Sequence, residues 1–175
     1  MTRTVYARRE ITGDPGKFRA VLVDHAPRLL QQATGVEPSP PAEDGSFIMQ
    51  LTGHSLGVDA HKLVRAHLGE ASAHGSWLRI PIRWAADPGR HLFPVFEGGI
   101  ELQEEDCAHA ELGLFGQYRP PLGPLGMAGD LTALDGAARQ AAMRLVNGLA
   151  RQLIDAVYGD GAPRQPAPLS GSSGS

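Results

Sequence analysis

The 175-residue chain contains a single cysteine, Cys107, few aromatic residues and no long apolar run. One cysteine excludes an internal disulfide framework and a zinc site built from several cysteines. No apolar run approaches the roughly 18 residues that a membrane span needs. The first fifteen residues also lack the apolar stretch of a signal peptide. These absences predict a soluble, cytoplasmic protein.

Positive charge is also scarce, because 16 Lys and Arg residues face 19 Asp and Glu residues and leave a net charge of −3. Proteins that bind nucleic acids usually carry a basic patch or stripe. Because this chain shows none, no nucleic-acid partner is expected. The sequence has no P-loop, no dinucleotide-binding glycine fingerprint and no paired carboxylates. We therefore expect no cofactor.

Glycine and proline are abundant by contrast, with 22 and 14 residues. Many of them lie in two stretches that have little to bury. Residues 159–175 form a flexible or disordered tail whose SGSSGS end looks appended, and residues 37–45 form a loop between ordered segments. The remainder, residues 1–158, is predicted to be a single domain.

The first part of the chain predicts one strand followed by two short helices. Residues 2–12 are β-branched and charged, which is typical of a strand. Asp14 can cap a helix, and Pro15 suits its first position. Pro27 breaks this helix, and a second short helix is expected over residues 27–33.

The middle of the chain has the alternation of strands. Leu78, Ile80, Ile82 and Trp84 alternate with more polar neighbours, and Pro81 among them indicates an edge or a bulge. Further strands are expected over residues 93–103, bent at Gly98-Gly99, and over 110–118. Residues 104–106 are interpreted as an exposed turn rather than a metal-binding acidic cluster.

After residue 130 the apolar period becomes helical and continues to about residue 158. The order of one strand, two short helices, several strands and one long helix is an α+β pattern. The long helix must bury its apolar face, and a curved antiparallel sheet is the only expected surface large enough. The stripe consists of Leu131, Leu134, Ala138, Ala141, Leu145, Leu149 and Leu153.

Three segments carry a resemblance to a known family: WLRIPIRW (residues 77–84), HLFPVFEGGIEL (91–102) and LFGQYRPPLGPLG (114–126). With the order of elements, residues 2–158 resemble uncharacterised bacterial members of the START/polyketide-cyclase (SRPBCC) superfamily. The resemblance implies a helix-grip fold, in which the sheet wraps around the C-terminal helix and leaves an apolar cavity. Members of the superfamily bind lipids, sterols, polyketides or hormones, and some catalyse cyclisation or dehydration.

One local motif points to a different chemistry. Residues 53–57, GHSLG, match the G-x-S-x-G nucleophile elbow of serine hydrolases, in which a strand precedes the serine and a helix follows it. Residues 58–68 could form that helix. The last histidine is His109, however, and no later segments could carry the acid and histidine of a triad. A turn between two strands is the favoured interpretation, with the serine hydrolase as the less favoured one.

The histidines give no metal site and only a weak catalytic candidate. His61 and His67 lie six residues apart, which in one strand separates them by about 20 Å. Cys107 and His109 supply two ligands, which do not make a site. His91 precedes an apolar segment and could orient a ligand or transfer a proton. No catalytic residue is assigned, and the weak candidates are His91 and Tyr118.

The resemblance leads to a functional hypothesis, which is the binding of a small, largely apolar, lipid- or polyketide-like ligand by a carrier or sensor. The alternatives are a cyclase or dehydratase acting on a polyketide-like substrate, and a module that binds proteins through a sheet edge or a homodimer surface. The predicted ligand-binding residues are Ile80, Ile82, Trp84, Phe93, Phe96, Tyr118, Met143 and Val146.

Overall fold

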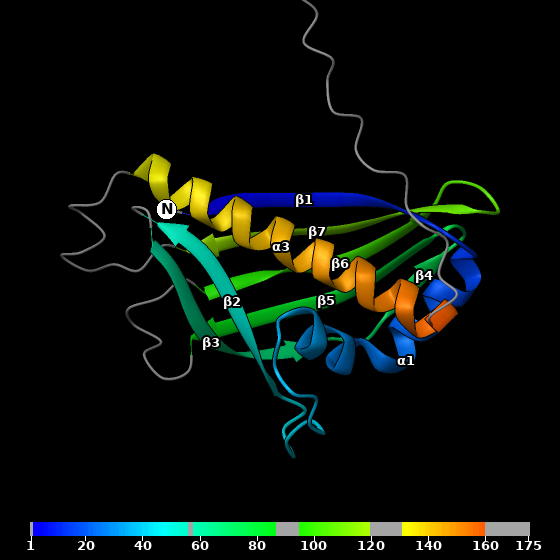
Figure 1. The fold of residues 1–175 in the computed structure, drawn as a ribbon, viewed down its shortest axis with the longest axis horizontal. Coiled ribbons are helices and arrows are strands. Elements are labelled where there is room, and N and C mark those ends of the chain that lie inside the picture. The colour runs from blue at the N-terminus through cyan, green and yellow to red at the C-terminus, as the bar shows by residue number, and fades with distance from the viewer. Residues whose placement is uncertain (1, 56–57, 87–94, 120–130, 160–175) are drawn as a thin grey trace, which may run out of the picture.

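The computed structural model describes residues 2–55, 58–86, 95–119 and 131–159. A seven-stranded antiparallel sheet curls around a long C-terminal helix, with a second helix beside that helix (Figure 1). The strands follow the order β1-β7-β6-β5-β3-β2, and the short β4 pairs with β5. Their bounds are β1 Arg3–Thr12, β2 Phe47–Ser55, β3 Val58–Leu68, β4 Ser72–His74, β5 Trp77–Ala86, β6 Val95–Glu104 and β7 His109–Arg119; the helices are α1 Pro15–Ala33 and α3 Leu131–Tyr158.

This architecture confirms the predicted α+β helix-grip class. Three predictions concern residues outside the described ranges: His91 as a weak catalytic candidate, Phe93 as a ligand-binding residue, and residues 160–175 as part of a flexible or disordered tail. Within the described ranges, no helix is long and apolar enough to cross a membrane.

The two predicted short helices are the two halves of α1. The Asp14 carboxylate caps the helix by accepting hydrogen bonds from the N–H groups of Gly16 and Lys17, at 2.9 and 3.3 Å. The backbone leaves helical geometry at His25, where φ is −131° and ψ is 15°. Pro27 lies two residues further on, and a proline ring inside a helix removes one hydrogen bond and clashes with the preceding turn.

Strand β5 has the predicted alternation, with every second residue from Leu78 to Ala86 buried. Of the two alternatives for Pro81, the edge is wrong, because β5 pairs with β6 on one side and with β3 and β4 on the other, and the bulge is confirmed, because residues 69–71 lie opposite only residues 80–81. Pro81 lies where β3 ends and β4 has not begun, and its carbonyl accepts a hydrogen bond from Gly69 N at 2.8 Å. A proline is tolerated inside this sheet because the neighbouring strand is interrupted there.

Helix α3 contacts β1, β2, β7 and α1. Its C-terminal half is fastened to α1 at two points. Gly148 lies against the end of α1, where a Cβ atom would be 2.5 Å from the Ala33 carbonyl oxygen. The Tyr158 hydroxyl accepts a hydrogen bond from Asp14 N at 2.6 Å, and its ring packs edge-on against Phe18. The predicted burial of the long helix against the sheet is confirmed.

The predicted turn between β6 and β7 is also present. Its Asp106 carboxylate accepts a hydrogen bond from Ala108 N at 2.7 Å and contacts His109 Nδ1 at 2.9 Å. These contacts lower the pKa of Asp106, first through the Ala108 N–H and then through His109. The hydrogen bond and the charge of Asp106 raise the pKa of His109. Glu104 ends β6 and pairs with Arg19 of α1 at 2.6 Å.

Two glycines of α3 provide a matched test of the α1–α3 contact. Gly136→Ala has open space around its new methyl group and should raise the free energy of unfolding by about 0.5–1 kcal/mol through helix propensity. Gly148→Ala gains the same propensity but meets the Ala33 carbonyl, and should lower that free energy by about 1–3 kcal/mol. Urea unfolding of both variants measures the difference. Equal stabilisation by both substitutions would show that the helices do not meet closely at Gly148.

The contact between Asp106 and His109 in the turn between β6 and β7 predicts that the free energy of unfolding depends on pH. The contribution of His109 to stability is present below its ordinary pKa of about 6.5 and is lost as pH rises through its raised value. The contribution of Asp106 is present above its ordinary pKa of about 3.9 and is lost as pH falls through its lowered value. Both contributions to stability are therefore fully present between about pH 3.9 and pH 6.5. NMR titration should show the pKa of His109 decreasing in Asp106→Asn and unchanged in Asp24→Asn, whereas equal values in all three proteins would contradict the pairing.

Candidate functional site

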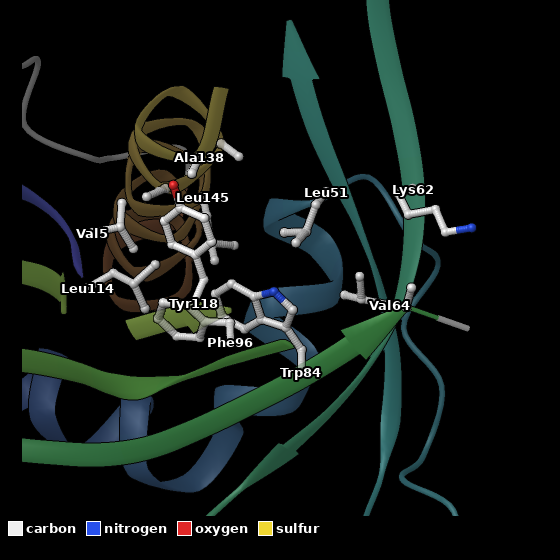
Figure 2. Close-up of a pocket in the computed structure, with 13 residues that line it drawn as sticks. Val5, Leu51, Lys62, Val64, Trp84, Phe96, Leu114, Tyr118, Ala138 and Leu145 are labelled. Atoms are coloured by element: carbon white, nitrogen blue, oxygen red, sulfur yellow. The ribbon is translucent and has the colours of Figure 1, made fainter. Parts of the chain in front are cut away.

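A cavity lies between the sheet and the N-terminal half of α3 (Figure 2). About 160 Å³ of it is open to the centres of water-sized molecules. Its walls are almost entirely apolar, which is typical of sites for small molecules. The lining consists of Val5, Leu51, Lys62, Val64, Trp84, Ala86, Phe96, Leu114, Tyr118, Ala138, Ala141, Ala142 and Leu145.

Three aromatic residues from consecutive strands form one wall. Trp84 of β5 lies opposite Phe96 of β6 in the register, and Phe96 lies opposite Tyr118 of β7. The rings of Trp84 and Phe96 are stacked, with centroids 3.8 Å apart and planes at 12°. Such cross-strand aromatic pairs stabilise a sheet and fix their own orientation. The wall is therefore a fixed aromatic surface.

The Phe96 ring has room because glycines lie beneath it. Gly98 and Gly116 face each other across β6 and β7. A Cβ atom on Gly116 would be 2.3 Å from Phe96 Cζ, and one on Gly98 would be 2.7 Å from the same atom. The sequence suggested that glycines here allow the sheet to curve. They also allow an aromatic ring to lie flat across the sheet.

The opposite wall belongs to α3 and is made of small side chains. Ala138, Ala141 and Ala142 line the cavity, whereas the later inward positions hold Leu149 and Leu153, both fully packed. Alanine is too short to reach the aromatic wall, so space remains beside the first half of the helix. The cavity follows from this change from alanine to leucine along one helical face.

Polar groups at the cavity are few. Figure 2 shows the Trp84 indole nitrogen turned toward the space between Tyr118 and Leu51, the Tyr118 hydroxyl directed toward α3 near Ala138, and the Lys62 amino group directed away from the cavity. The indole N–H can only donate a hydrogen bond, whereas the phenol can donate or accept one. Trp84 and Tyr118 are both buried, with 8% and 5% of their surface exposed. Either group could orient an oxygen atom of a bound molecule.

The structure brings three of the predicted ligand-binding residues together at this cavity: Trp84, Phe96 and Tyr118. Ile80, Ile82 and Val146 are buried in the continuous core and do not line it. Met143 is 36% exposed and also does not line the cavity, because it lies on another side of α3 from Ala142. Strand alternation identifies a buried face but not which part of that face meets a cavity.

Several lining residues were missed by the sequence reasoning. Val5, Leu51 and Leu114 come from β1, β2 and β7, and β1 and β2 form opposite edges of the sheet, so only the curl of the sheet around α3 brings these residues to one cavity. No local pattern distinguishes them from other core residues. The alanines of α3 did carry a signal, because Ala138 and Ala141 interrupt a stripe otherwise formed by leucines.

The G-x-S-x-G motif lies in a hairpin. Gly53, His54 and Ser55 end β2, and Ser55 lies opposite Val58, the first residue of β3. Residues 58–68 therefore form a strand and not the helix that a nucleophile elbow requires. The two flanking strands of the favoured interpretation are present, and residues 56 and 57 between them lie outside the described residues. The helix expected under the serine-hydrolase alternative is contradicted.

Comparison with known proteins gives matches in structure only. No protein-family model matches the chain, and no curated protein sequence matches it significantly. Among solved structures, the Zhui aromatase/cyclase from Streptomyces sp. R1128 is similar with a TM-score of 0.59 and 14% identity, over 93% of this chain and 100% of that one. A conserved protein from Geobacillus kaustophilus is similar with a TM-score of 0.58 and 14% identity, over 87% and 95%.

A further similar structure is norcoclaurine synthase from Thalictrum flavum, in complex with dopamine and hydroxybenzaldehyde. Its TM-score is 0.51 and its identity 13%, over 89% of this chain and 88% of that one. At such identities the similarity concerns the fold. The similarity thus confirms the helix-grip fold that the resemblance implied.

Proposed function

We propose that this protein binds a small, largely apolar molecule in the cavity between the sheet and α3, as a carrier or sensor. The observation that carries the proposal is an apolar cavity with a fixed aromatic wall on one side and three alanines on the other. Protein interiors are close-packed, with few voids larger than a water molecule. A void of this kind is therefore a candidate binding site.

The unfilled apolar space supports the same conclusion. Side chains that border such a space lose packing partners, and this loss costs stability. Larger side chains at Ala138, Ala141 or Ala142 would reduce that cost. A bound molecule would recover it by restoring the missing contacts.

The size and lining of the cavity limit the ligand. An apolar cavity of about 150 Å³ in another protein admits benzene, so a body of one or two rings, or a short branched chain, suits this one. Apolar walls select by shape more than by hydrogen bonding. The Trp84 N–H and the Tyr118 hydroxyl favour a ligand that carries one or two oxygen acceptors.

A cavity-filling substitution tests this proposal. Ala138→Leu adds three carbon atoms to the alanine wall and should lower the affinity for naphthalene by about tenfold or more, because overpacking costs about 1–3 kcal/mol. Ala137→Leu, one position along the helix and outside the lining, should leave the affinity unchanged. Isothermal titration calorimetry measures both.

Native mass spectrometry of the purified protein and a thermal-shift screen complete the test. Ligands of the native state raise the unfolding temperature by mass action. A screen of one- and two-ring compounds that produces no shift, with no retained molecule in the mass spectrum, would contradict the proposed function. A naphthalene affinity that is the same in Ala138→Leu would place binding elsewhere.

The second candidate is an enzyme of cyclase or dehydratase type acting on a polyketide-like substrate. Two observations favour it, namely the similarity in fold to an aromatase/cyclase and the position of Tyr118 in the lining of the cavity. His91, the other candidate acid or base, lies outside the described residues. Tyr118 is therefore the residue to test.

Tyr118→Phe removes the hydroxyl and keeps the ring. Under the enzyme hypothesis, turnover of a poly-β-ketone analogue should fall by about 10²–10⁴-fold, the usual contribution of a general acid or base, while binding persists. Tyr6→Phe, on the exposed side of β1, is the control and should retain turnover. Unchanged turnover in Tyr118→Phe, measured by product chromatography, would remove Tyr118 from the chemistry.

A further inference from the structure

A second pocket adjoins the apolar cavity. Leu51, Ala141 and Leu145 line both of them, so the two spaces lie on either side of the same three residues. The second pocket has a volume of about 510 Å³ and lies between β1, β2 and α3. Its lining combines polar and apolar surface in similar amounts, whereas that of the first is almost entirely apolar.

Three arginines line this second pocket: Arg9 from β1, and Arg144 and Arg151 from α3. Among the described residues that line it, none is Asp or Glu. Arg144 and Arg151 are seven residues apart, which places them on one helical face about 10.5 Å from each other. The pocket therefore gathers positive charge on a protein whose net charge is −3.

Arg9 is the central member of this group. It occupies an inward-facing position of β1, between the buried Ala7 and Ile11. Its Nη1 donates a hydrogen bond to Asn147 Oδ1 at 2.8 Å. Asn147 lies between Arg144 and Arg151 on α3, so this bond holds the guanidinium of Arg9 beside the face that carries the other two.

We propose that the three arginines bind an anionic group of the same ligand whose apolar part occupies the cavity. This inference rests on the proposed function and specifies its ligand class, a small amphipathic molecule that bears a carboxylate or phosphate. Guanidinium groups match the geometry of both anions and bind them through paired hydrogen bonds. The two compartments are neighbours that share Leu51, Ala141 and Leu145 in their linings, so a ligand that occupies both must reach past these side chains.

Two probes of the same shape test the charged compartment. 1-Naphthylacetate carries a carboxylate, and 1-naphthylacetamide replaces it by a neutral amide. Calorimetry at low salt should show the carboxylate binding about tenfold more tightly, as expected for hydrogen bonds to a charged group. This advantage should shrink as salt is added, because the arginines of α3 are exposed to solvent.

Single substitutions assign the effect to particular residues. Arg144→Gln and Arg151→Gln should each lower the affinity for naphthylacetate by about three- to tenfold and leave that for naphthylacetamide unchanged. Arg139→Gln removes the same charge from an exposed position of α3 outside the pocket and should change neither affinity. All three positions are exposed, so folding should be preserved, and thermal unfolding checks this.

The outcomes separate the two proposals. If both probes bind equally and the arginine variants change nothing, the anionic compartment is overturned and the apolar cavity stands. If neither probe binds, the cavity proposal fails and this inference fails with it. Inorganic phosphate is the last probe, and we expect it to compete only weakly with naphthylacetate. If phosphate alone bound as tightly as naphthylacetate, the pocket would be a site for a free anion, and the proposal of an amphipathic ligand would be overturned.

Discussion

The packing of α3 into the curled sheet is the contact on which the other features depend. The helix has one apolar face, and that face is filled unequally along its length. In the C-terminal half, Leu149 and Leu153 are fully buried, Gly148 meets α1 at the Ala33 carbonyl, and Tyr158 bonds to the cap of α1. This half anchors the helix, and the alanines of the other half leave space against the sheet.

The sheet contributes its own constraint to the same site. Stacking of Trp84 on Phe96 requires the Phe96 ring to lie across β6 and β7, and the paired Gly98 and Gly116 leave the room for it. A side chain at either glycine would displace the ring toward the cavity or the backbone. The aromatic wall is thus set by cross-strand register, while the helical wall is set by side-chain size. The cavity exists because both conditions hold at the same level of the sheet.

The fold was largely predictable from the sequence because its elements are strongly periodic. The alternation in β5 and the stripe of α3 each identify a buried face, and Asp14 with Pro15 marks a helix start by local chemistry alone. The sequence left open whether Pro81 marks an edge or a bulge, since the interruption between β3 and β4 depends on the pairing of distant segments. For the same reason the sequence distinguished poorly between cavity and core: Ile82 and Trp84 share one face of β5, and only the placement of α3 decides which of them meets open space.

Arg9 shows how such non-local information changes the interpretation of a residue. In the sequence it is one of two adjacent arginines in a charged strand, and only its two-residue spacing from Ala7 and Ile11 marks it as inward-facing. In the fold it interrupts an apolar face, and its bond to Asn147 places it with two further arginines beside the cavity. The pocket with the three arginines thus adjoins the unfilled apolar space, which lies beside the alanine-containing half of α3, away from the contacts that anchor its C-terminal half. On the proposed function, one amphipathic ligand would occupy both, and the anchored half would keep the fold intact when the site is empty.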